Sequence, residues 1–332
     1  MIKTKTDTLN YDLSKKNIAQ TRYENPNESK LLIADTKEII TFKELKNILP
    51  KKSVLVFNKS TVEDVRIKTT KKDTGGKIEI FILNKISNNL CECLLKFNGT
   101  KNIGTTLNTV NFEFKIMDKK DEIFIIKTSS SINNIIKNYG LTPLPPYIKD
   151  NKSQYKYYKT DYSKGGFSIA ASTAGLHFNK EIIDKFKKDG IVIKYINLDI
   201  GLGTFKPINT EYINEYEIHK ESYSMYEKDY IHLLKLKENG YVIFSIGTTV
   251  LRTLETIALN GKFHGDTNLY ITPGFNFKIV DFLITNFHAP KSTLLSIVLT
   301  IYGKKWKELY MYAQKKKLKF LSFGDAVLFK IK

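Results

Sequence analysis

The chain has 332 residues, of which 42% are hydrophobic, so it is long enough to form two domains that each bury a core. This composition excludes a wholly disordered protein. The N-terminal segment MIKTKTDTLNYDL lacks the apolar stretch of a signal peptide, and no apolar run approaches the roughly 18 residues of a membrane span. We therefore expect a cytoplasmic protein without a membrane segment.

A net charge of +19 predicts a polyanionic partner such as a nucleic acid. Only three of the 53 basic residues are arginines, Arg22, Arg66 and Arg252, and an excess of lysine also arises from a bias in composition. An arginine retained against such a bias is expected to have a geometric role, such as a bidentate contact. Cys91 and Cys93 are interpreted as buried thiols in a reducing compartment, and we expect no metal site.

The first 150 residues predict the start of one domain and the whole of another. Residues 41–44 have the spacing of a capping box for a helix that ends at Pro50, and residues 54–57 predict a buried strand. From about residue 65 to 128, short alternating runs are separated by turn-forming clusters, which is typical of antiparallel strands. We interpret residues 61–139 as a small antiparallel all-β barrel inserted into the main domain.

The main domain, residues 1–60 and 140–332, is predicted to be α/β (mixed α+β), because strands and helices alternate after about residue 155. Polar loops then fall at strand ends, where open α/β sheets bind ligands. The predicted elements are a helix over 179–188 capped by Asn179, strands over 191–200, 241–246 and 268–271, a helix over 250–259, and a closing hairpin over 318–331.

The segment from Asp281 to Gly303 combines a buried strand, a polar loop and a long apolar helix. Pro290 disfavours helix at the residue before it, and Ser292 or Thr293 is a natural N-cap. We expect His288 and Lys291 to be presented together from an accessible loop, toward a ligand held at the helix N-terminus. The alternative is an ordinary capped helix with a solvated lysine and a satisfied histidine.

Three further loops carry candidate site residues. Small residues at 168–176 lead to His177 and allow close approach of a ligand to the backbone, although a tight turn with a core histidine fits equally. Gly201 and Gly203 follow a strand but lack the third glycine of a dinucleotide-binding motif. In the segment 245–255, Thr248 or Thr249 is expected to cap a helix whose first turn carries Arg252, which together form a carboxylate site. The alternative is an Arg252–Glu255 pair on the helix surface.

His219 and Glu221 are two residues apart, so an extended backbone places them on one face, where they could exchange a proton or orient each other. A surface pair is the alternative.

Nine motifs give the chain a strong resemblance to the S-adenosylmethionine:tRNA ribosyltransferase-isomerases of queuosine biosynthesis. They occur in the family's order: YDLSKKNIAQ (11–20), TGGKIEI (74–80), YGLTPLPPYI (139–148), ASTAGLHF (171–178), GLGTF (201–205), IGTT with RTLE (246–255), NLYITPGF with FKIVD (268–281), ITNFHAPKSTLL (284–295) and FGDAVL (323–328). The resemblance implies an α/β domain with an inserted β-barrel. It also implies that S-adenosylmethionine is consumed as a substrate, with no separate cofactor.

The implied reaction transfers the ribosyl group to 7-aminomethyl-7-deazaguanine at the wobble position of tRNA with a GUN anticodon. The product is epoxyqueuosine-tRNA, and adenine and methionine leave. We expect the protein to act as a monomer. Departures from the family pattern in residues 25–32 and 57–67, and at Ser172, Asp199 and Tyr216, keep open a tRNA-binding relative without catalysis. An S-adenosylmethionine-dependent tRNA methyltransferase is a second alternative, although the chain lacks the expected glycine-rich loop.

The chemistry of this reaction suggests a role for each candidate residue. A base is needed for the C5′ proton beside the sulfonium, and an acid for departing adenine. The expected assignments are as follows: His177 and His288 as acid and base; Glu221 as a base or ribose ligand; Arg252 with Thr248 and Thr249 for the methionine carboxylate; Gly201, Gly203, Thr204 and Phe205 around the nucleoside; Phe205 or Phe287 near the sulfonium; Lys291, Asn286 and Ser292 for negative charge; and Arg66 and Lys77 for tRNA.

Overall fold

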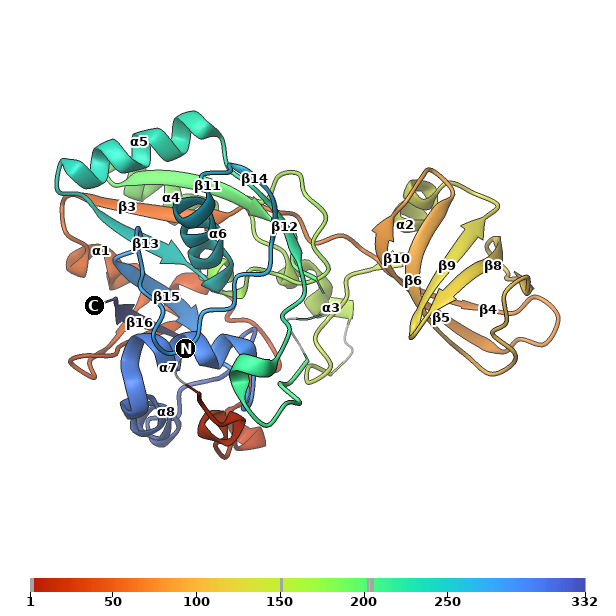
Figure 1. Ribbon diagram of the computed structural model, residues 1–332, viewed down its shortest axis with the longest axis horizontal. Coiled ribbons are helices and arrows are strands. Elements are labelled where there is room, and N and C mark those ends of the chain that lie inside the picture. The colour runs from red at the N-terminus through yellow and green to blue at the C-terminus, as the bar shows by residue number, and fades with distance from the viewer. Residues whose placement is uncertain (1–2, 150–151, 202, 204–205, 332) are drawn as a thin grey trace. The chain divides into compact units, whose positions relative to one another are not determined.

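The computed structural model describes residues 3–149, 152–201, 203 and 206–331. The chain divides into two compact units, one of residues 1–61 and 145–332 and one of residues 62–144 (Figure 1). The second boundary follows Leu144 because strand β10 (Gly140–Leu141) pairs with β4 (Arg66–Thr70) of the smaller unit.

Within the described residues, the larger unit is organised around a nine-stranded mixed sheet (Figure 1). Four neighbouring strands in its middle, β11, β3, β13 and β15, run parallel to one another. The strand order is β14 (His264–Thr267), β12 (Glu221–Ser224), β11 (Val192–Leu198), β3 (Ser53–Asn58), β13 (Val242–Ile246), β15 (Phe282–Asn286), β16 (Ala326–Lys330), β1 (Lys30–Ile33) and β2 (Ile39–Thr41).

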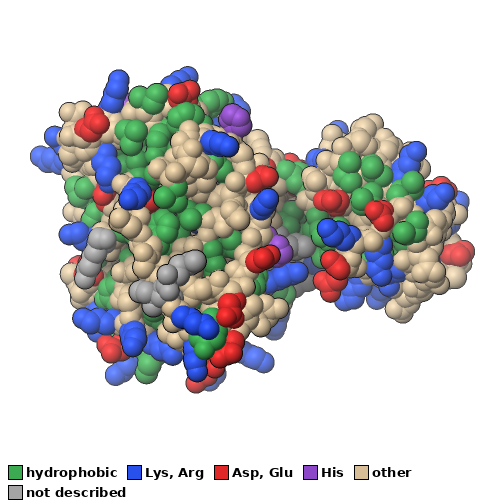
Figure 2. All heavy atoms as spheres, viewed as in Figure 1, with side chains coloured by type: hydrophobic (Ala, Val, Ile, Leu, Met, Phe, Trp, Pro, Cys, Tyr) green, Lys and Arg blue, Asp and Glu red, His purple; other side chains and the backbone are tan. Residues whose placement is uncertain are grey.

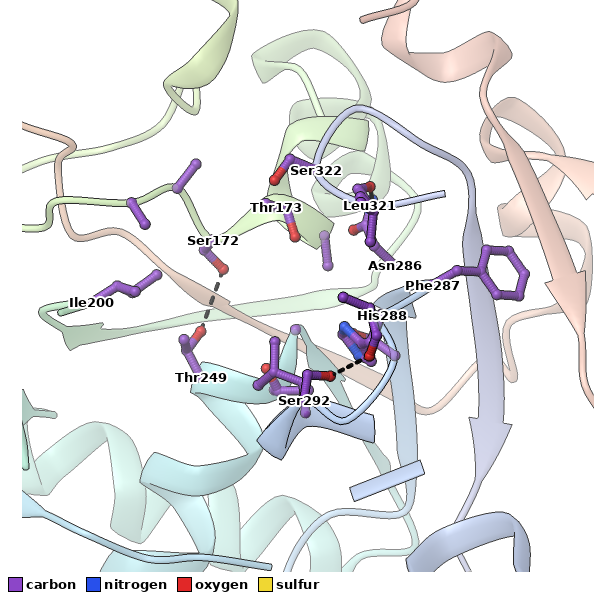
Figure 3. Close-up of a pocket in the computed structure, with 18 of the residues that line it drawn as sticks. Ser172, Thr173, Ile200, Thr249, Asn286, Phe287, His288, Ser292, Leu321 and Ser322 are labelled. Carbon is purple, nitrogen blue, oxygen red and sulfur yellow. Dashed lines mark hydrogen bonds between the residues drawn. The ribbon is translucent and has the colours of Figure 1, made fainter. Parts of the chain in front are cut away.

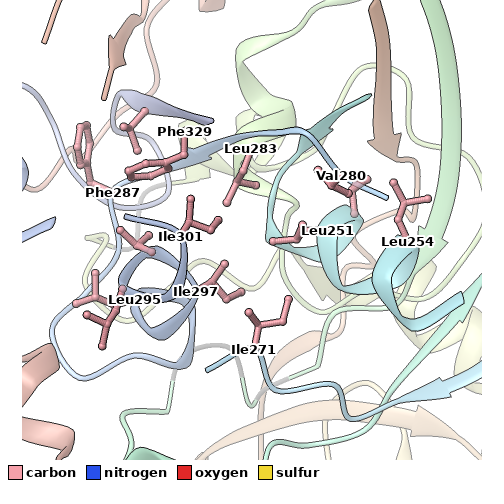
Figure 4. Packing of buried hydrophobic residues seen from close by; sticks show 14 of the residues in the cluster. Leu251, Leu254, Ile271, Val280, Leu283, Phe287, Leu295, Ile297, Ile301 and Phe329 are labelled. Carbon is pink, nitrogen blue, oxygen red and sulfur yellow. The ribbon is translucent and has the colours of Figure 1, made fainter. Parts of the chain in front are cut away.

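Helices cover both faces of this sheet, and the sequence of β3 shows why. All of its residues are buried, as a parallel strand between two helix layers requires. Val54 and Val56 belong to the core on one face, whereas Leu55 and Phe57 belong to the core on the other. The first core receives α5 (Glu227–Glu238), α6 (Thr248–Asn260), α7 (Thr293–Tyr302) and α8 (Trp306–Lys315), and the second receives α4 (Lys180–Lys188). Figure 4 shows part of the first core, where Leu251, Leu283 and Ile297 meet.

Shorter helical segments connect these elements. They are α1 (Leu45–Ile48), α3 (Lys152–Tyr155), η1 (Thr6–Leu9), η2 (Lys15–Asn17), η3 (Pro26–Glu28), η4 (Phe42–Glu44), η5 (Lys156–Tyr158), η6 (Thr173–His177), η8 (Ile213–Glu215) and η9 (Gly303–Lys305).

The smaller unit holds, among its described residues, a seven-stranded antiparallel sheet that curls into a half-barrel (Figure 1). Lys71 and Thr109, which follow its strands β4 and β7, form an isolated bridge. The strand order is β10, β4, β5 (Lys77–Lys85), β6 (Leu90–Phe97), β9 (Ile123–Thr128), β8 (Glu113–Lys120) and β7 (Thr106–Asn108), and α2 (Ile132–Tyr139) follows β9. Neither β7 nor α2 was predicted from the sequence, and the closed all-β barrel stays a prediction.

Several local predictions are confirmed, because they rest on interactions between near neighbours. The capping box joins Thr41 and Glu44, and Asn179 and Ser292 accept hydrogen bonds from first-turn N–H groups of α4 and α7. Cys91 and Cys93 are buried free thiols.

Two strand predictions are wrong, because long-range pairing decides them. The strand expected over 268–271 lies instead over residues 264–267 as β14. Residues 318–331 form no hairpin, since β16 pairs with β15 on one side and β1 on the other.

Candidate functional site

A cavity of about 290 Å³ lies where three parallel strands end (Figure 3). Ile200 follows β11, Gly247 follows β13, and Asn286 ends β15. Ligands commonly bind at this edge of an open α/β sheet. The lining residues are Pro146, Tyr147, Tyr158, Ala170, Ala171, Ser172, Thr173, Ala174, Ile200, Lys206, Pro207, Gly247, Thr248, Thr249, Thr285, Asn286, Phe287, His288, Ala289, Pro290, Ser292, Leu294, Leu321 and Ser322.

Two α-helices, α6 and α7, begin at this cavity, and of these two α7 alone is capped by a side chain. The N-cap of α6 is Gly247, so the predicted capping by Thr248 or Thr249 is wrong. Gly247 has φ 95°, a conformation that favours glycine, and an added Cβ would also lie 3.2 Å from Ser172 Oγ. In α7, Ser292 Oγ accepts from Leu295 N at 3.2 Å. The first-turn N–H groups of α6 therefore have no side-chain cap and can bind a ligand. In α7, one first-turn N–H group already donates to Ser292.

His288 lines the cavity but is not an accessible loop residue. Its side chain is buried, 7% exposed, and its Nε2 lies 3.1 Å from Thr285 Oγ1. The Tyr11 hydroxyl donates to its carbonyl oxygen at 2.5 Å. Burial lowers the pKa of His288 to about 3, so the imidazole is neutral near pH 7. The expectation of an accessible His288 is therefore corrected.

Lys291 leaves the loop in a different direction and is not among the residues that line the cavity. Its Nζ lies 2.7 Å from an Asp7 carboxylate oxygen, and its backbone N–H donates to Leu9 O at 2.9 Å. Its φ of 53° places it in the left-handed region, which turns the chain after Pro290. The loop does not present His288 and Lys291 to one ligand.

Asn286 and Phe287 are adjacent in the chain, but their side chains point in different directions. The Asn286 amide nitrogen donates to the carbonyl oxygens of Leu321 and Gly324, at 3.0 and 3.3 Å. The Phe287 ring instead packs in the core, stacked 4.6 Å from Phe320, and points away from the cavity in Figure 3. The structure therefore does not place Phe287 where a sulfonium in the cavity would meet its ring.

His177 borders a separate small cavity of about 10 Å³, which shares Ser322 with the larger one. Its ring stacks on Phe42 with centroids 4.3 Å apart, and its Nδ1 lies 2.7 Å from Ser29 Oγ. Burial, followed by the charge of Arg22, lowers the pKa of His177 to about 3. Like His288, it is a neutral imidazole near pH 7.

Arg252 and Glu221 form a buried ion pair outside the cavity lining. Arg252 Nε also donates to Leu269 O at 2.9 Å, and the other Glu221 oxygen accepts from Gly201 N at 3.1 Å. The pair thus joins α6, β12 and the loop after β11. The structure does not bring Arg252 to the cavity as a carboxylate ligand, and neither does it support the alternative of a surface pair with Glu255. Glu255 is buried and accepts three backbone N–H groups of residues 278–280.

The predicted glycine loop is seen in part. Gly203 lies beside His219, where an added Cβ would approach the His219 ring to 2.3 Å. His219 is exposed, whereas the Glu221 carboxylate is buried against Arg252, so the two do not form the surface pair that was the alternative. The predicted contacts of Thr204 and Phe205 lie outside the described residues. Arg66 Nε pairs with Glu79 at 2.5 Å, and Lys77 is exposed at the start of β5.

Comparison with known proteins assigns the chain to a family. The profile of the family described as "Queuosine biosynthesis protein" matches residues 6–329. The chain belongs to this family. It is 37% identical over 333 residues to the S-adenosylmethionine:tRNA ribosyltransferase-isomerase of Sulfurihydrogenibium sp. (strain YO3AOP1), covering 98% of this chain and 99% of that relative.

Two further relatives agree over nearly their whole length. The S-adenosylmethionine:tRNA ribosyltransferase-isomerase of Carboxydothermus hydrogenoformans is 39% identical over 336 residues, covering 98% of this chain and 99% of the relative. The crystal structure of S-adenosylmethionine tRNA ribosyltransferase from Thermotoga maritima is 30% identical with a TM-score of 0.54, covering 97% of this chain and 99% of that one.

One departure from the pattern of this queuosine biosynthesis family has a structural explanation. Asp199 Oδ1 accepts hydrogen bonds from Ser60 Oγ at 2.5 Å and from Phe167 N at 2.9 Å. Ser60 Oγ also lies 2.8 Å from Ser168 Oγ. Asp199 therefore holds the backbone next to the cavity segment that begins at Ala170.

Part of the cavity wall was not predicted from the sequence. Tyr147, Tyr158, Lys206 and Ser322 line it, although none was assigned a role. The signal for Tyr147 was available, because it is the next-to-last residue of the family motif YGLTPLPPYI. Lys206 is the one charged side chain among the described residues that line the cavity.

Across the described residues, no group of three or more His, Cys, Asp and Glu side chains is arranged to hold a metal ion. The same residues contain no helix with the length and hydropathy of a membrane span.

Proposed function

We propose that the protein is an S-adenosylmethionine:tRNA ribosyltransferase-isomerase. It transfers the ribosyl group to 7-aminomethyl-7-deazaguanine at the wobble position of tRNA with a GUN anticodon, and isomerises the sugar to give epoxyqueuosine. Adenine and methionine leave, so S-adenosylmethionine is a substrate and not a cofactor. Relatives with this name match nearly the whole chain. The observation that carries the proposal is the cavity, in which family motifs from residues 171–178, 246–255 and 284–295 meet.

The cavity offers a complementary surface to each part of S-adenosylmethionine. Ala170, Ala171 and Pro207 provide apolar walls for the nucleoside. The uncapped first turn of α6 and the Lys206 ammonium suit the methionine carboxylate. Tyr147, a half-buried aromatic residue of the lining, is proposed to take the place that Phe287 was expected to fill, since an aromatic face stabilises a cation such as the sulfonium.

His288 is our candidate for receiving a proton. A positively charged sulfur acidifies the adjacent C5′ protons, so the reaction needs an acceptor there. The neutral His288 imidazole lies in the cavity wall and is held through Thr285. A low pKa makes it a weak base, and it cannot supply a proton to departing adenine in its neutral form. The Ser292 hydroxyl donates to Ala289 O at 2.8 Å, so its role is to shape the loop.

Lysine on the protein surface is proposed to supply most phosphate contacts to tRNA, with Lys77 of the smaller unit among them. Arg66 is already paired, so it would have to exchange Glu79 for a phosphate. On the face in Figure 2, Lys and Arg side chains lie on both units with acidic side chains between many of them. We further propose that the inserted domain completes a closed barrel and that the protein acts as a monomer in the cytoplasm.

Incubation with S-adenosylmethionine and tRNA that carries the deazaguanine precursor tests the function. The expected products are adenine, methionine and a tRNA nucleoside with the mass of epoxyqueuosine. Formation of S-adenosylhomocysteine would identify a methyltransferase instead. Binding of tRNA without any product would identify a relative that has lost catalysis.

A further inference from the structure

Two segments from opposite ends of the larger unit are rich in basic side chains and contain no acidic residue. Residues 13–23 and 309–324 have no Asp or Glu, although the whole chain has 34 of them. The basic residues of the two segments are Lys15, Lys16, Arg22, Lys315, Lys316, Lys317 and Lys319. Both segments therefore carry a local excess of positive charge.

Hydrogen bonds place these two segments side by side. Phe320 N donates to Asn17 O at 2.7 Å, and the Lys319 ammonium donates to Lys16 O at 2.9 Å. The lysines of η2 are therefore neighbours of those that follow α8. We refer to Lys15, Lys16, Lys317 and Lys319 as the lysine surface.

The charges of the lysine surface are not neutralised within the protein. All four side chains are exposed, and none of them forms an ion pair with a described residue. Other lysines of the larger unit do so, since Lys194 pairs with Asp229 and Lys237 pairs with Asp281, each at 2.7 Å. Neighbouring ammonium groups without carboxylates repel one another, so the surface is complementary to a polyanion.

The dipole of α8 explains only part of this arrangement. The helix ends at Lys315 with Lys316 as its C-cap, where a cation interacts favourably with the helix dipole. This effect is confined to the last turn, whereas Lys15 and Lys16 belong to η2. A general bias toward lysine is not a sufficient explanation either, because it does not remove acidic residues from the same two segments.

The lysine surface continues into the wall of the large cavity. Leu321 follows Lys319 by two residues, so their Cα atoms are at most about 7 Å apart. Leu321 and Ser322 both line the cavity. In the other segment, Gln20 Nε2 donates at 3.0 Å to the carbonyl oxygen of Tyr147, which is also a lining residue. A polyanion on this surface could therefore place one of its units in the cavity.

RNA fits these features better than an anionic membrane does. Membrane-binding surfaces combine lysines with apolar side chains that enter the bilayer. In these two segments, which the structure describes completely, Met311 is the only large apolar side chain that is strongly exposed. A membrane would also leave the continuity with the cavity unexplained, whereas an RNA chain presents phosphates on either side of each nucleotide.

We propose that the lysine surface binds tRNA phosphates next to the nucleotide that enters the cavity. This inference rests on the proposed function, which supplies tRNA as the partner. A lysine ammonium contacts phosphate as a point charge, so these contacts position the tRNA backbone and do not read its sequence.

The test combines Lys15→Gln, Lys16→Gln and Lys317→Gln in one variant, which keeps the contact between Lys319 and the Lys16 carbonyl. Its affinity for tRNA with the deazaguanine precursor, measured by fluorescence anisotropy, should fall about tenfold or more at about 0.15 M salt. The slope of log K against log salt should become less steep by about 2, because three phosphate contacts are lost. Calorimetry should show unchanged affinity for S-adenosylmethionine, since these side chains do not line the cavity.

The matched control combines Lys51→Gln, Lys185→Gln and Lys188→Gln, which removes the same charge from exposed positions. Lys51 precedes β3, and the other two lie in α4, which leads into β11. These parallel strands begin at the edge of the sheet opposite to the cavity. The control variant should keep nearly the wild-type affinity and salt dependence.

A measurement on the wild-type protein does not depend on the folding of a variant. Bound tRNA should slow the chemical acetylation of Lys15, Lys16 and Lys317, as followed by mass spectrometry, but not that of Lys185 or Lys188. Equal protection of both groups, or of neither, would overturn the inference.

The other outcomes separate this inference from the proposed function. Equal losses of tRNA affinity in the two variants would show that only net charge matters and would overturn the lysine surface. Loss of binding to phosphatidylserine vesicles with unchanged tRNA affinity would identify a membrane surface instead. Wild-type protein that does not bind tRNA at all would overturn the proposed function. Wild-type tRNA affinity and adenine release in the surface variant would overturn this inference alone.

Discussion

Helix α6 takes part in two regions that differ in their charged side chains. Its first turn borders the cavity, where the described lining consists of apolar, aromatic, hydroxyl, amide and imidazole side chains and only Lys206 is charged. Its next turn carries Arg252, which is buried against Glu221 away from the cavity. A buried charge is costly without a partner. Arg252 is therefore paired with Glu221 inside the protein and does not lie where the ligand would bind. Charge in a loop sequence is thus a poor guide to which side chain meets the substrate.

The largest expected effect comes from breaking the buried ion pair. Arg252→Met leaves the Glu221 carboxylate buried without its cation, and we expect the free energy of unfolding to fall by about 3–5 kcal/mol. Adding Glu221→Gln, which keeps an acceptor for Gly201 N, should recover a large part of this loss. Urea unfolding of the wild-type protein and of these two variants measures both effects. Normal stability together with weakened binding of S-adenosylmethionine would instead indicate that Arg252 contacts the ligand.

His288→Ala tests the role of an uncharged side chain in the cavity wall. We expect adenine release per folded molecule to fall by about 10²-fold, the lower end for a positioned proton acceptor. Because His288 is buried and contacts Thr285, the free energy of unfolding should also fall, by about 1–2 kcal/mol. Single-turnover assays and urea unfolding on the same samples separate the two effects. A loss of stability with normal adenine release would show a structural histidine.

Acid should weaken the fold through the two buried histidines. Their pKa values are about 3 in the folded protein and about 6.5 when unfolded, so between these values the unfolded chain binds more protons. Stability is then complete above pH 6.5 and falls as the pH decreases, by about 2 kcal/mol per histidine at pH 5. Unfolding at pH 7 and pH 5 measures the loss. In His177→Phe, the part of the stability loss that is attributed to His177 should disappear. An unchanged loss would show that other groups cause it.

The smallest expected effect distinguishes two lysines near the same loop. Lys206→Met should weaken binding of S-adenosylmethionine by about 1 kcal/mol, because its ammonium is the charged group at the cavity. Lys291→Met is the matched control, since Lys291 pairs with Asp7 outside the lining. Calorimetry on both variants gives the difference directly. Equal losses would place Lys291 at the ligand, as the sequence had suggested.

The sequence by itself determined the local elements and the family. Helix caps such as Asn179 and Ser292, the buried strand around Val56 and the alternating strands of the smaller unit depend on neighbours within a few residues, so their patterns could be read directly. The nine ordered motifs also located much of the cavity wall. Asn286, Ser292 and Thr249 all line it, as their clustering with strand ends had suggested.

Tertiary structure alone decided where each side chain points. Lys291 and His288 are three residues apart, yet a left-handed backbone at Lys291 and its Asp7 partner send the two apart. The partner of Arg252 is Glu221, 31 positions away, and not Glu255, one helical turn away. His177 is held by Ser29, 148 positions away, and the Asn286 amide donates to Leu321 O, 35 positions away, and no local pattern contains either contact. Directions and partners of this kind follow from packing between distant segments, and spacing along the chain does not encode them.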